Sequence, residues 1–182
     1  MNECNLVYFL CVLVDTTEQR ALQCFVRGKA LNALDGYSAD AEENLTKAVK
    51  LQPKHSEAWT SLGMCMWKKG DLLQAKTCFK ESIAAAENVE ALQELSMLTR
   101  QLSRRGESST AVMQRLNESI SIAKRAIHLD VRNHKSWYIF GNAHCMLFFS
   151  GSHSMSDLEA ALAAYRRSEM LGGDSNPDLW FN

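Results

Sequence analysis

Proline and glycine are scarce in this chain, since its 182 residues contain only 2 prolines and 9 glycines. Both residue types interrupt helices, and the long stretches between them are rich in Ala, Leu, Glu, Lys, Gln and Met, which favour helix. The shortage of helix breakers therefore predicts an all-α protein. A hydrophobic content of 46% suffices for one domain or one short array of helices at this length.

Net charge is also low, because 20 basic residues almost balance 21 acidic ones. No overall field draws such a protein to nucleic acid or to an anionic membrane, so we predict no direct DNA binding and no membrane binding. The apolar run at residues 6–14 is far shorter than a membrane span of about 20 residues. We interpret it as a buried segment, with a poor signal peptide as the alternative.

Paired cysteines and catalytic patterns are missing as well. The six cysteines contain no Cys-x-x-Cys spacing, which is typical of reduced thiols in the cytoplasm or nucleus. No histidine forms a His-x-x-x-His pair, and no glycine-rich turn suits a phosphate group. His144 and Cys145 are adjacent, but neighbouring helical residues point in different directions. We therefore expect a protein that is not an enzyme and that holds no metal or other cofactor.

A repeating helix hairpin is present instead, and it is clearest between residues 56 and 88. Its landmark residues are Trp59, Leu62, Gly63, Trp67, Gly70, Ala75 and Phe79. Trp59 and Leu62 are expected on the buried face of a first helix. Gly63 beside them lets a second helix approach closely, and Phe79 of that helix is expected to fill the space.

The turn inside this hairpin has its own signature, since Gly70 suits a left-handed C-cap and Asp71 a following N-cap. The same order of landmarks recurs before and after the hairpin, at Gly28, Ala41, Leu45 and Ala48 and again at Trp137, Phe140, Gly141, Ala161 and Tyr165. Such offsets are typical of the tetratricopeptide repeat. We predict an all-α tetratricopeptide-repeat superhelix of stacked antiparallel helix pairs, an α-solenoid, rather than an ordinary helical bundle.

The expected organisation begins with a divergent segment at residues 1–16. Four repeat units follow, at about 17–55, 56–88, 89–133 and 134–175, and a partial unit ends the chain at 176–182. The third unit is longer than the usual repeat of about 34 residues, with a second helix expected near 109–128. A Ser-, Gly- and His-rich loop is expected at 150–156.

The first helices of such an array form a concave wall that suits an extended peptide. Residues opposite the buried faces are the candidates for this groove. They are Glu57, Thr60, Met64 and Trp67, then Gln93, Met97 and Arg100, and then Lys135, Tyr138, Asn142 and Cys145. Arg100 offers a bidentate partner for a carboxylate, and Asn142 an amide that donates and accepts. The alternative is that Arg100 is merely solvated and Asn142 caps a turn.

Particular strings resemble one family more closely. EAWTSLGMCMWKKGD, ALQELSMLTRQL and SWYIFGNAH, in this order, are similar to the repeat region of the tetratricopeptide repeat protein 5 (Strap) family, and the resemblance covers most of residues 27–179. The irregular third unit and the long loop make it specific. The usual N-terminal helical segment of the family is not matched by residues 1–16.

The resemblance implies a stress-responsive transcription cofactor, cytoplasmic and nuclear, that binds transcriptional coactivators. It also implies recognition of the nascent tubulin N-terminus at the ribosome, which promotes tubulin mRNA decay. Arg100 would then contact an acidic residue of the nascent peptide, while Lys47 and Lys50 would face the ribosome. From their spacing alone, these lysines belong more simply to a solvated helix face. A structural assembly module and a cochaperone-type adaptor are the alternative functions.

Overall fold

The computed structural model describes residues 16–102 and 106–172 of the chain. The chain divides into two compact units, residues 1–86 and 87–182, and each is described here by itself. Residues 1–15 of the expected divergent segment, with the apolar run at 6–14, and the expected partial repeat at 176–182 lie outside the described residues. No helix in the described part has both the length and the apolar content that a membrane crossing requires.

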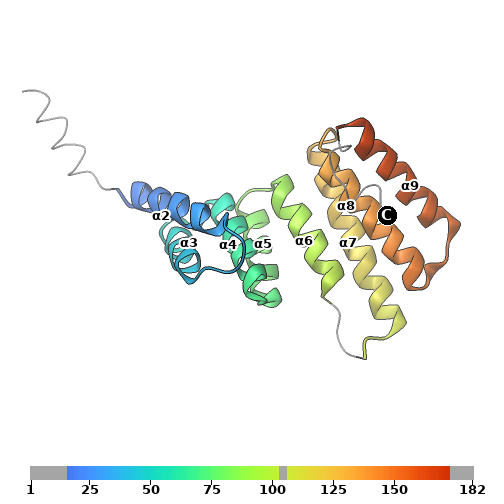
Figure 1. Cartoon of the computed structure of the whole chain (residues 1–182), viewed down its shortest axis with the longest axis horizontal. Helices are drawn as coiled ribbons and strands as arrows, with labels where there is room; N and C mark the ends of the chain where they lie inside the picture. The colour runs from blue at the N-terminus through green and yellow to red at the C-terminus, as the bar shows by residue number, and fades with distance from the viewer. Residues whose placement is uncertain (1–15, 103–105, 173–182) are drawn as a thin grey trace, which may run out of the picture. The chain divides into compact units, whose positions relative to one another are not determined.

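Unit 1 contains two helix pairs (Figure 1). In chain order the helices are α2 (Thr17–Asn32), α3 (Ala39–Leu51), α4 (Ser56–Lys69) and α5 (Leu72–Ala85). α2 packs on α3, and α4 packs on α5. Each helix begins where a side chain accepts a backbone N–H bond, and these N-caps are Thr16, Ser38, His55 and Asp71. Gly70 ends α4 with a φ of 87°, so the predicted turn at Gly70 and Asp71 is confirmed.

Unit 2 contains a second set of helices (Figure 1). They are α6 (Val89–Gln101), α7 (Ser109–Leu129), α8 (His134–Leu147), a π-helical turn η1 (Phe148–Ser152) and α9 (Met155–Met170). The long second helix expected near 109–128 is present as α7. The loop expected at 150–156 is shorter than predicted, because η1 extends α8 and α9 already begins at Met155. Gly151, with a φ of 138°, makes the sharp change of direction.

A glycine notch closes three of the helix pairs. A Cβ atom added at Gly63 would lie 2.5 Å from Phe79 Cε1, and one at Gly141 would lie 2.6 Å from Tyr165 Cε1. At Gly28 the corresponding contact is Leu45 Cγ, at 2.7 Å. These distances are far below ordinary van der Waals contact, so the predicted fit of a small residue against a large one is confirmed.

The pair of α6 and α7 closes differently. Ser96 stands at the same distance from its N-cap as Gly63 does in α4, and it meets Ser119 instead of an aromatic ring. The two hydroxyl oxygens are 2.9 Å apart, and each hydroxyl lies 3.0 Å from the partner's backbone carbonyl oxygen. Both serines are completely buried. Hydrogen bonds therefore hold these two helices together where shape holds the others.

Trp59 and Trp137 differ from expectation, because both rings are half-buried at the edge of the core. Each indole Nε1 donates a hydrogen bond to a carbonyl of the loop before its own helix, Pro53 O and Val131 O respectively, both at 2.8 Å. The indole hydrogen needs an acceptor, and these loops supply it. The repeated tryptophan therefore joins each first helix to the connection that precedes it.

Candidate peptide-binding surface

In unit 1 the candidate residues of α4 do not share one environment. Glu57 is exposed and lies 4.0 Å from the Lys29 ammonium group. Met64 and Trp67 are half-buried, and the Trp67 ring stands edge-on to Phe79 with 6.3 Å between ring centroids. Thr60 is only 2% exposed, and its hydroxyl lies 2.8 Å from that of Ser82. We therefore leave Thr60 out of the candidate surface.

Gln93, in unit 2, is also buried and does not line the candidate surface. It is 3% exposed, and its Nε2 donates to Asn133 Oδ1 at 2.9 Å and to Ser136 Oγ at 2.7 Å. Asn133 is the N-cap of α8, so Gln93 of α6 orders the beginning of the next first helix. Its amide thus serves the packing of α6 on α8.

Lys135 already has a partner inside unit 2. Its ammonium group lies 2.9 Å from Glu94 Oε1, and the Glu94 side chain is only 8% exposed. A carboxylate in so dry a place needs a counterion, and Lys135 supplies it. Lys135 therefore offers little free charge to a ligand.

Arg100 differs from Lys135 because it has no carboxylate partner within residues 16–102 and 106–172. Its Nη1 lies 3.7 Å from Met146 Sδ of α8, and its buried Nε has no hydrogen-bond partner there. Burial lowers the pKa of the guanidinium below its usual value, while the nearby Tyr165 and Tyr138 act in the opposite direction. A half-buried cation without a counterion is costly, and an incoming carboxylate would compensate it.

Arg115 holds the helix end that carries Arg100, although the sequence contained no signal for this contact. Arg115 Nε lies 3.1 Å from Glu107 Oε1 and Nη2 lies 3.0 Å from Oε2, in a pair whose side chains are 14% and 11% exposed. The Arg115 Nη1 also donates to the backbone carbonyl of Arg100 at 2.5 Å. Arg115 thereby satisfies the C-terminal carbonyl group that α6 leaves open.

Tyr138 and Asn142 lie on α8 and meet Tyr165 of α9. The Tyr165 hydroxyl donates to Asn142 Oδ1 at 2.7 Å, and the rings of Tyr138 and Tyr165 are 6.0 Å apart at their centroids. Burial first, and Cys145 second, raise the pKa of Tyr165. Asn142 is half-buried and bonds to the neighbouring helix rather than capping a turn. With half-buried Met97 and Cys145, these residues and Arg100 form the part of unit 2 that is best suited to a ligand.

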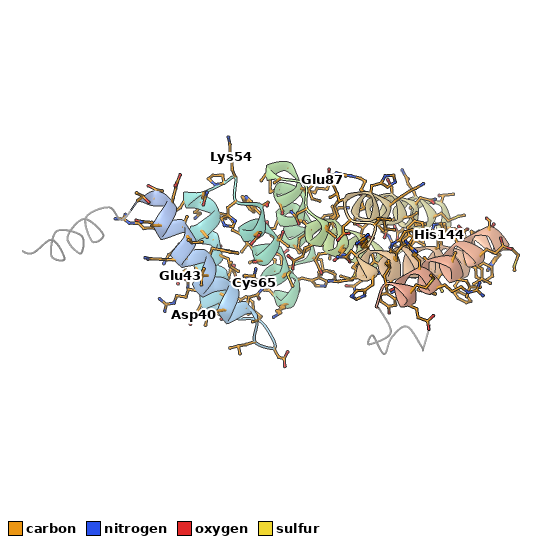
Figure 2. The ribbon with its side chains drawn as sticks, turned by 90° about the horizontal axis from the view of Figure 1, so that it is seen from above. Asp40, Glu43, Lys54, Cys65, Glu87 and His144 are labelled. Carbon is orange, nitrogen blue, oxygen red and sulfur yellow. The ribbon has the colours of Figure 1, made fainter. Side chains whose placement is uncertain are left out.

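Lys47 and Lys50 are exposed on α3. The Lys47 ammonium group lies 2.7 Å from Glu43 Oε1, and this hydrogen bond raises the pKa of Lys47. Lys54, in the connection to α4, extends away from the ribbon (Figure 2). The three lysines stand on the surface of unit 1, as the sequence indicated.

His144 forms a polar contact that the sequence did not reveal. Its Nδ1 lies 3.0 Å from Asp157 Oδ1, and the Ser152 hydroxyl donates to Asp157 Oδ2 at 2.8 Å. The serine bonds to the carboxylate rather than to the imidazole, so the three side chains do not form a nucleophile–base pair. They connect α8, η1 and α9.

Burial disfavours the thiolate form of Cys65 and Cys78, because it raises the pKa of both. Cys24, Cys65, Cys78 and Cys145 are free, and burial raises the pKa of Cys78 to about 11. A thiolate is the reactive form of cysteine, and a raised pKa disfavours it.

Comparison with known proteins agrees with this geometry. The family profile named Tetratricopeptide repeat matches residues 56–89. Tetratricopeptide repeat protein 5 of Bos taurus is 41% identical over 172 residues, and the match covers 93% of this chain and 39% of that protein. The Homo sapiens protein of the same name is 40% identical with the same coverage. Residues 56–89 are a tetratricopeptide repeat, and the chain has the tetratricopeptide-repeat fold.

The chain spans 39% of the length of the curated relatives that it matches. A solved structure of YrrB, described as a TPR protein with an unusual peptide-binding site, has a TM-score of 0.46 and 15% identity, over 74% of this chain and 78% of YrrB. The predicted resemblance to the tetratricopeptide repeat protein 5 family and the predicted repeat fold are confirmed. Both support a protein-interaction scaffold without a catalytic role.

Proposed function

We propose that this chain binds an extended acidic peptide at the face formed by α6 and α8 of unit 2. The observation that carries this proposal is the Arg100 guanidinium, which is half-buried, lacks a carboxylate partner among the described residues and has an unsatisfied Nε. A half-buried charge costs free energy unless it is paired, so an apolar side chain or a charge with a counterion is expected at such a place. A ligand carboxylate is the simplest counterion.

The proposed ligand is the nascent tubulin N-terminus, in keeping with the similarity to tetratricopeptide repeat protein 5. The finer roles follow from the same similarity: promotion of tubulin mRNA decay at the ribosome, and a stress-responsive part in transcription through coactivators. Both roles imply a cytoplasmic and nuclear protein. The proposal also retains the division into repeat units at 17–55, 56–88, 89–133 and 134–175, with the partial unit at 176–182.

Lys47 and Lys50 are the proposed contacts to the ribosome. Their support is exposure on α3, a few residues before Lys54, which is also exposed. Lys47 forms an ion pair with Glu43 in which both side chains are solvent-exposed, and such pairs exchange partners at little cost in free energy. Ribosome co-sedimentation of the full chain, with Lys47→Glu/Lys50→Glu against wild type, measures this contact.

The peptide proposal is tested with a fluorescent synthetic peptide of the tubulin N-terminus and the full chain. Arg100→Ala removes a charge-assisted hydrogen bond, so we expect the Kd to rise about ten-fold or more. Arg166→Ala is the matched control, because Arg166 is an exposed arginine of the same unit. Equal affinity of wild type and Arg100→Ala would contradict the proposal.

An assembly module is the second candidate function. Its support is the outer side of α9, where Met155, Leu162 and Met170 are exposed. Trp180, which the sequence also suggested for this role, lies outside the described residues. Sizing chromatography distinguishes the two functions, since self-association that Leu162→Ser abolishes supports assembly. A carboxylate clamp of the cochaperone type is less well supported, because Lys135 is engaged by Glu94.

A further inference from the structure

Tyr165 combines two contacts that the corresponding residues of other helix pairs do not combine. Its ring fills the notch at Gly141, as Phe79 fills the notch at Gly63 and Leu45 the one at Gly28. Phe79 and Leu45 have no polar atom. Tyr165 carries a hydroxyl, and this hydroxyl donates to Asn142 Oδ1 at 2.7 Å. The residue that closes the helix pair therefore also contacts the candidate surface.

The surroundings of the hydroxyl favour one direction for its hydrogen. Its oxygen lies 2.7 Å from Asn142 Oδ1, and an amide oxygen can only accept, so a phenol that keeps its proton donates it there. Burial raises the pKa of Tyr165, so the phenol keeps its proton. The hydrogen then points to Asn142 Oδ1, which leaves the amide no freedom to exchange its oxygen and nitrogen.

The side-chain amide of Asn142 is consequently held in one orientation. Its oxygen is used by Tyr165, while Nδ2 has no acceptor among residues 16–102 and 106–172. An asparagine amide donates and accepts, but with its oxygen turned to Tyr165 the group that this amide presents on its other side is the NH2, with two donor hydrogens. Arg100, which has donors only, lies on the neighbouring first helix α6.

We propose that Tyr165 is a positioning residue that fixes the Asn142 amide with its NH2 group toward the ligand, so that this part of the surface selects hydrogen-bond acceptors. The inference rests on the proposed function of this face. The ligand it selects has a backbone carbonyl for Asn142 beside a carboxylate for Arg100. A ligand that presents an ammonium or guanidinium group at the same place is rejected, because donor would meet donor.

Binding of the tubulin N-terminal peptide to a set of variants of the full chain tests this role. Tyr165→Phe keeps the ring in the Gly141 notch and removes only the hydroxyl, so we expect an unchanged melting temperature and a Kd about three- to five-fold higher. Asn142→Asp keeps an acceptor for Tyr165 but loses the donor, and we expect it to bind at least as weakly as Asn142→Ala. Tyr37→Phe, which removes an exposed hydroxyl in unit 1, is the control and should bind like wild type.

A double-mutant cycle and a measurement on the free protein complete the test. Asn142→Ala should weaken binding less in the Tyr165→Phe background than in wild type. In the free protein, the NMR order parameter of the Asn142 side-chain amide should fall in Tyr165→Phe. Full affinity of Tyr165→Phe, or an additive cycle with an unchanged order parameter, would overturn the inference. If wild type fails to bind the peptide, the proposed function fails for that peptide, whereas the order parameter still decides the role of Tyr165.

Discussion

The α4–α5 pair and the α6–α7 pair show two ways to close the same helix hairpin. In α4–α5, Phe79 fills the notch at Gly63, and Trp67 packs edge-on against Phe79. In α6–α7, Ser96 and Ser119 exchange hydrogen bonds, and Arg100 stands at the position that Trp67 has relative to its N-cap. Since Ser119 takes the place of an aromatic residue in α7, a Trp at the position of Arg100 would have no such ring to pack on. This position holds a guanidinium group instead.

The two residues at this position therefore differ in role: Trp67 stabilises its hairpin, and Arg100 is suited to bind a ligand. Trp67 adds to the apolar packing of α4–α5, whereas the Nε of Arg100 in α6–α7 has no hydrogen-bond acceptor among the described residues. The basic residues in the last turns differ in the same way. Lys69 of α4 bonds to both carboxylate oxygens of Glu42, and Arg100 of α6 has no carboxylate partner within the described residues.

The largest effect is expected from Phe79→Ala, because Phe79 is completely buried against Gly63. Its loss leaves a cavity and should lower the free energy of unfolding by about 3–5 kcal/mol. Urea denaturation followed by circular dichroism measures the change. Leu73→Ala on the same helix is the control, since Leu73 is 71% exposed. A loss no greater than that of Leu73→Ala would mean that shape does not close the α4–α5 pair.

A smaller loss is expected from Ser96→Ala, about 0.5–1.5 kcal/mol, because the contact between the two hydroxyls is lost while the Ser119 hydroxyl keeps the Ser96 backbone carbonyl as its acceptor. Ser119→Ala should have a similar effect. The double variant should lose less than the sum of the two single variants, since each single variant already removes the same contact between the hydroxyls. The same denaturation experiment measures all three, and strictly additive losses would contradict a shared hydrogen-bonded contact.

The next effect has the opposite sign. Arg100→Met keeps a long side chain and removes a half-buried charge that has no carboxylate partner among the described residues, so the free energy of unfolding should stay the same or rise by about 1 kcal/mol. Affinity for an acidic peptide should fall in the same variant. Lys69→Met is the contrasting variant, because it leaves Glu42 without its lysine partner and should be destabilising. Destabilisation by Arg100→Met would show that Arg100 serves the fold.

The smallest effect concerns pH. The hydrogen bond from Lys69, followed by that from Tyr37, lowers the pKa of Glu42 below its usual value of 4.5. The unfolded chain therefore binds a proton at Glu42 at higher pH than the folded chain does, so the contribution is fully present above about 4.5 and is lost as pH falls through the folded pKa. Wild type should thus exceed Lys69→Met in stability at pH 7, with the difference vanishing near pH 2. High salt should shrink it. A difference that persists at pH 2 would point to packing of the Lys69 stem.

Local contacts were predictable from the sequence because neighbours in the chain create them. The turn at Gly70 and Asp71 follows from backbone preference, and the meeting of Gly63 with Phe79 follows from helical spacing across one short turn. The contact of Arg115 with Glu107 and with the end of α6 was not predictable. Charged residues of that kind occur throughout the chain, and only the path of the connection decides which of them meet.

The candidate site shows the same limit. Thr60, Gln93 and Lys135 lie on first helices, but Thr60 and Gln93 are buried, and each of the three contacts a residue that is distant in sequence. The role of Tyr165 was seen only as packing. Its hydroxyl contact with Asn142 depends on how α9 lies on α8, and sequence spacing does not specify that to within a hydrogen-bond length.

Helix-forming residues, caps and the small-against-large pattern are written locally, so the order of residues was enough to predict helical hairpins of the tetratricopeptide type. Which polar groups remain free for a partner depended on the folded chain. A hydrogen bond or ion pair needs two groups to meet within about 3 Å, and in this protein the deciding partners lie on different helices. Arg100 and the Asn142 amide nitrogen stand out because, within the described residues, packing brought no carboxylate to the first and no acceptor to the second.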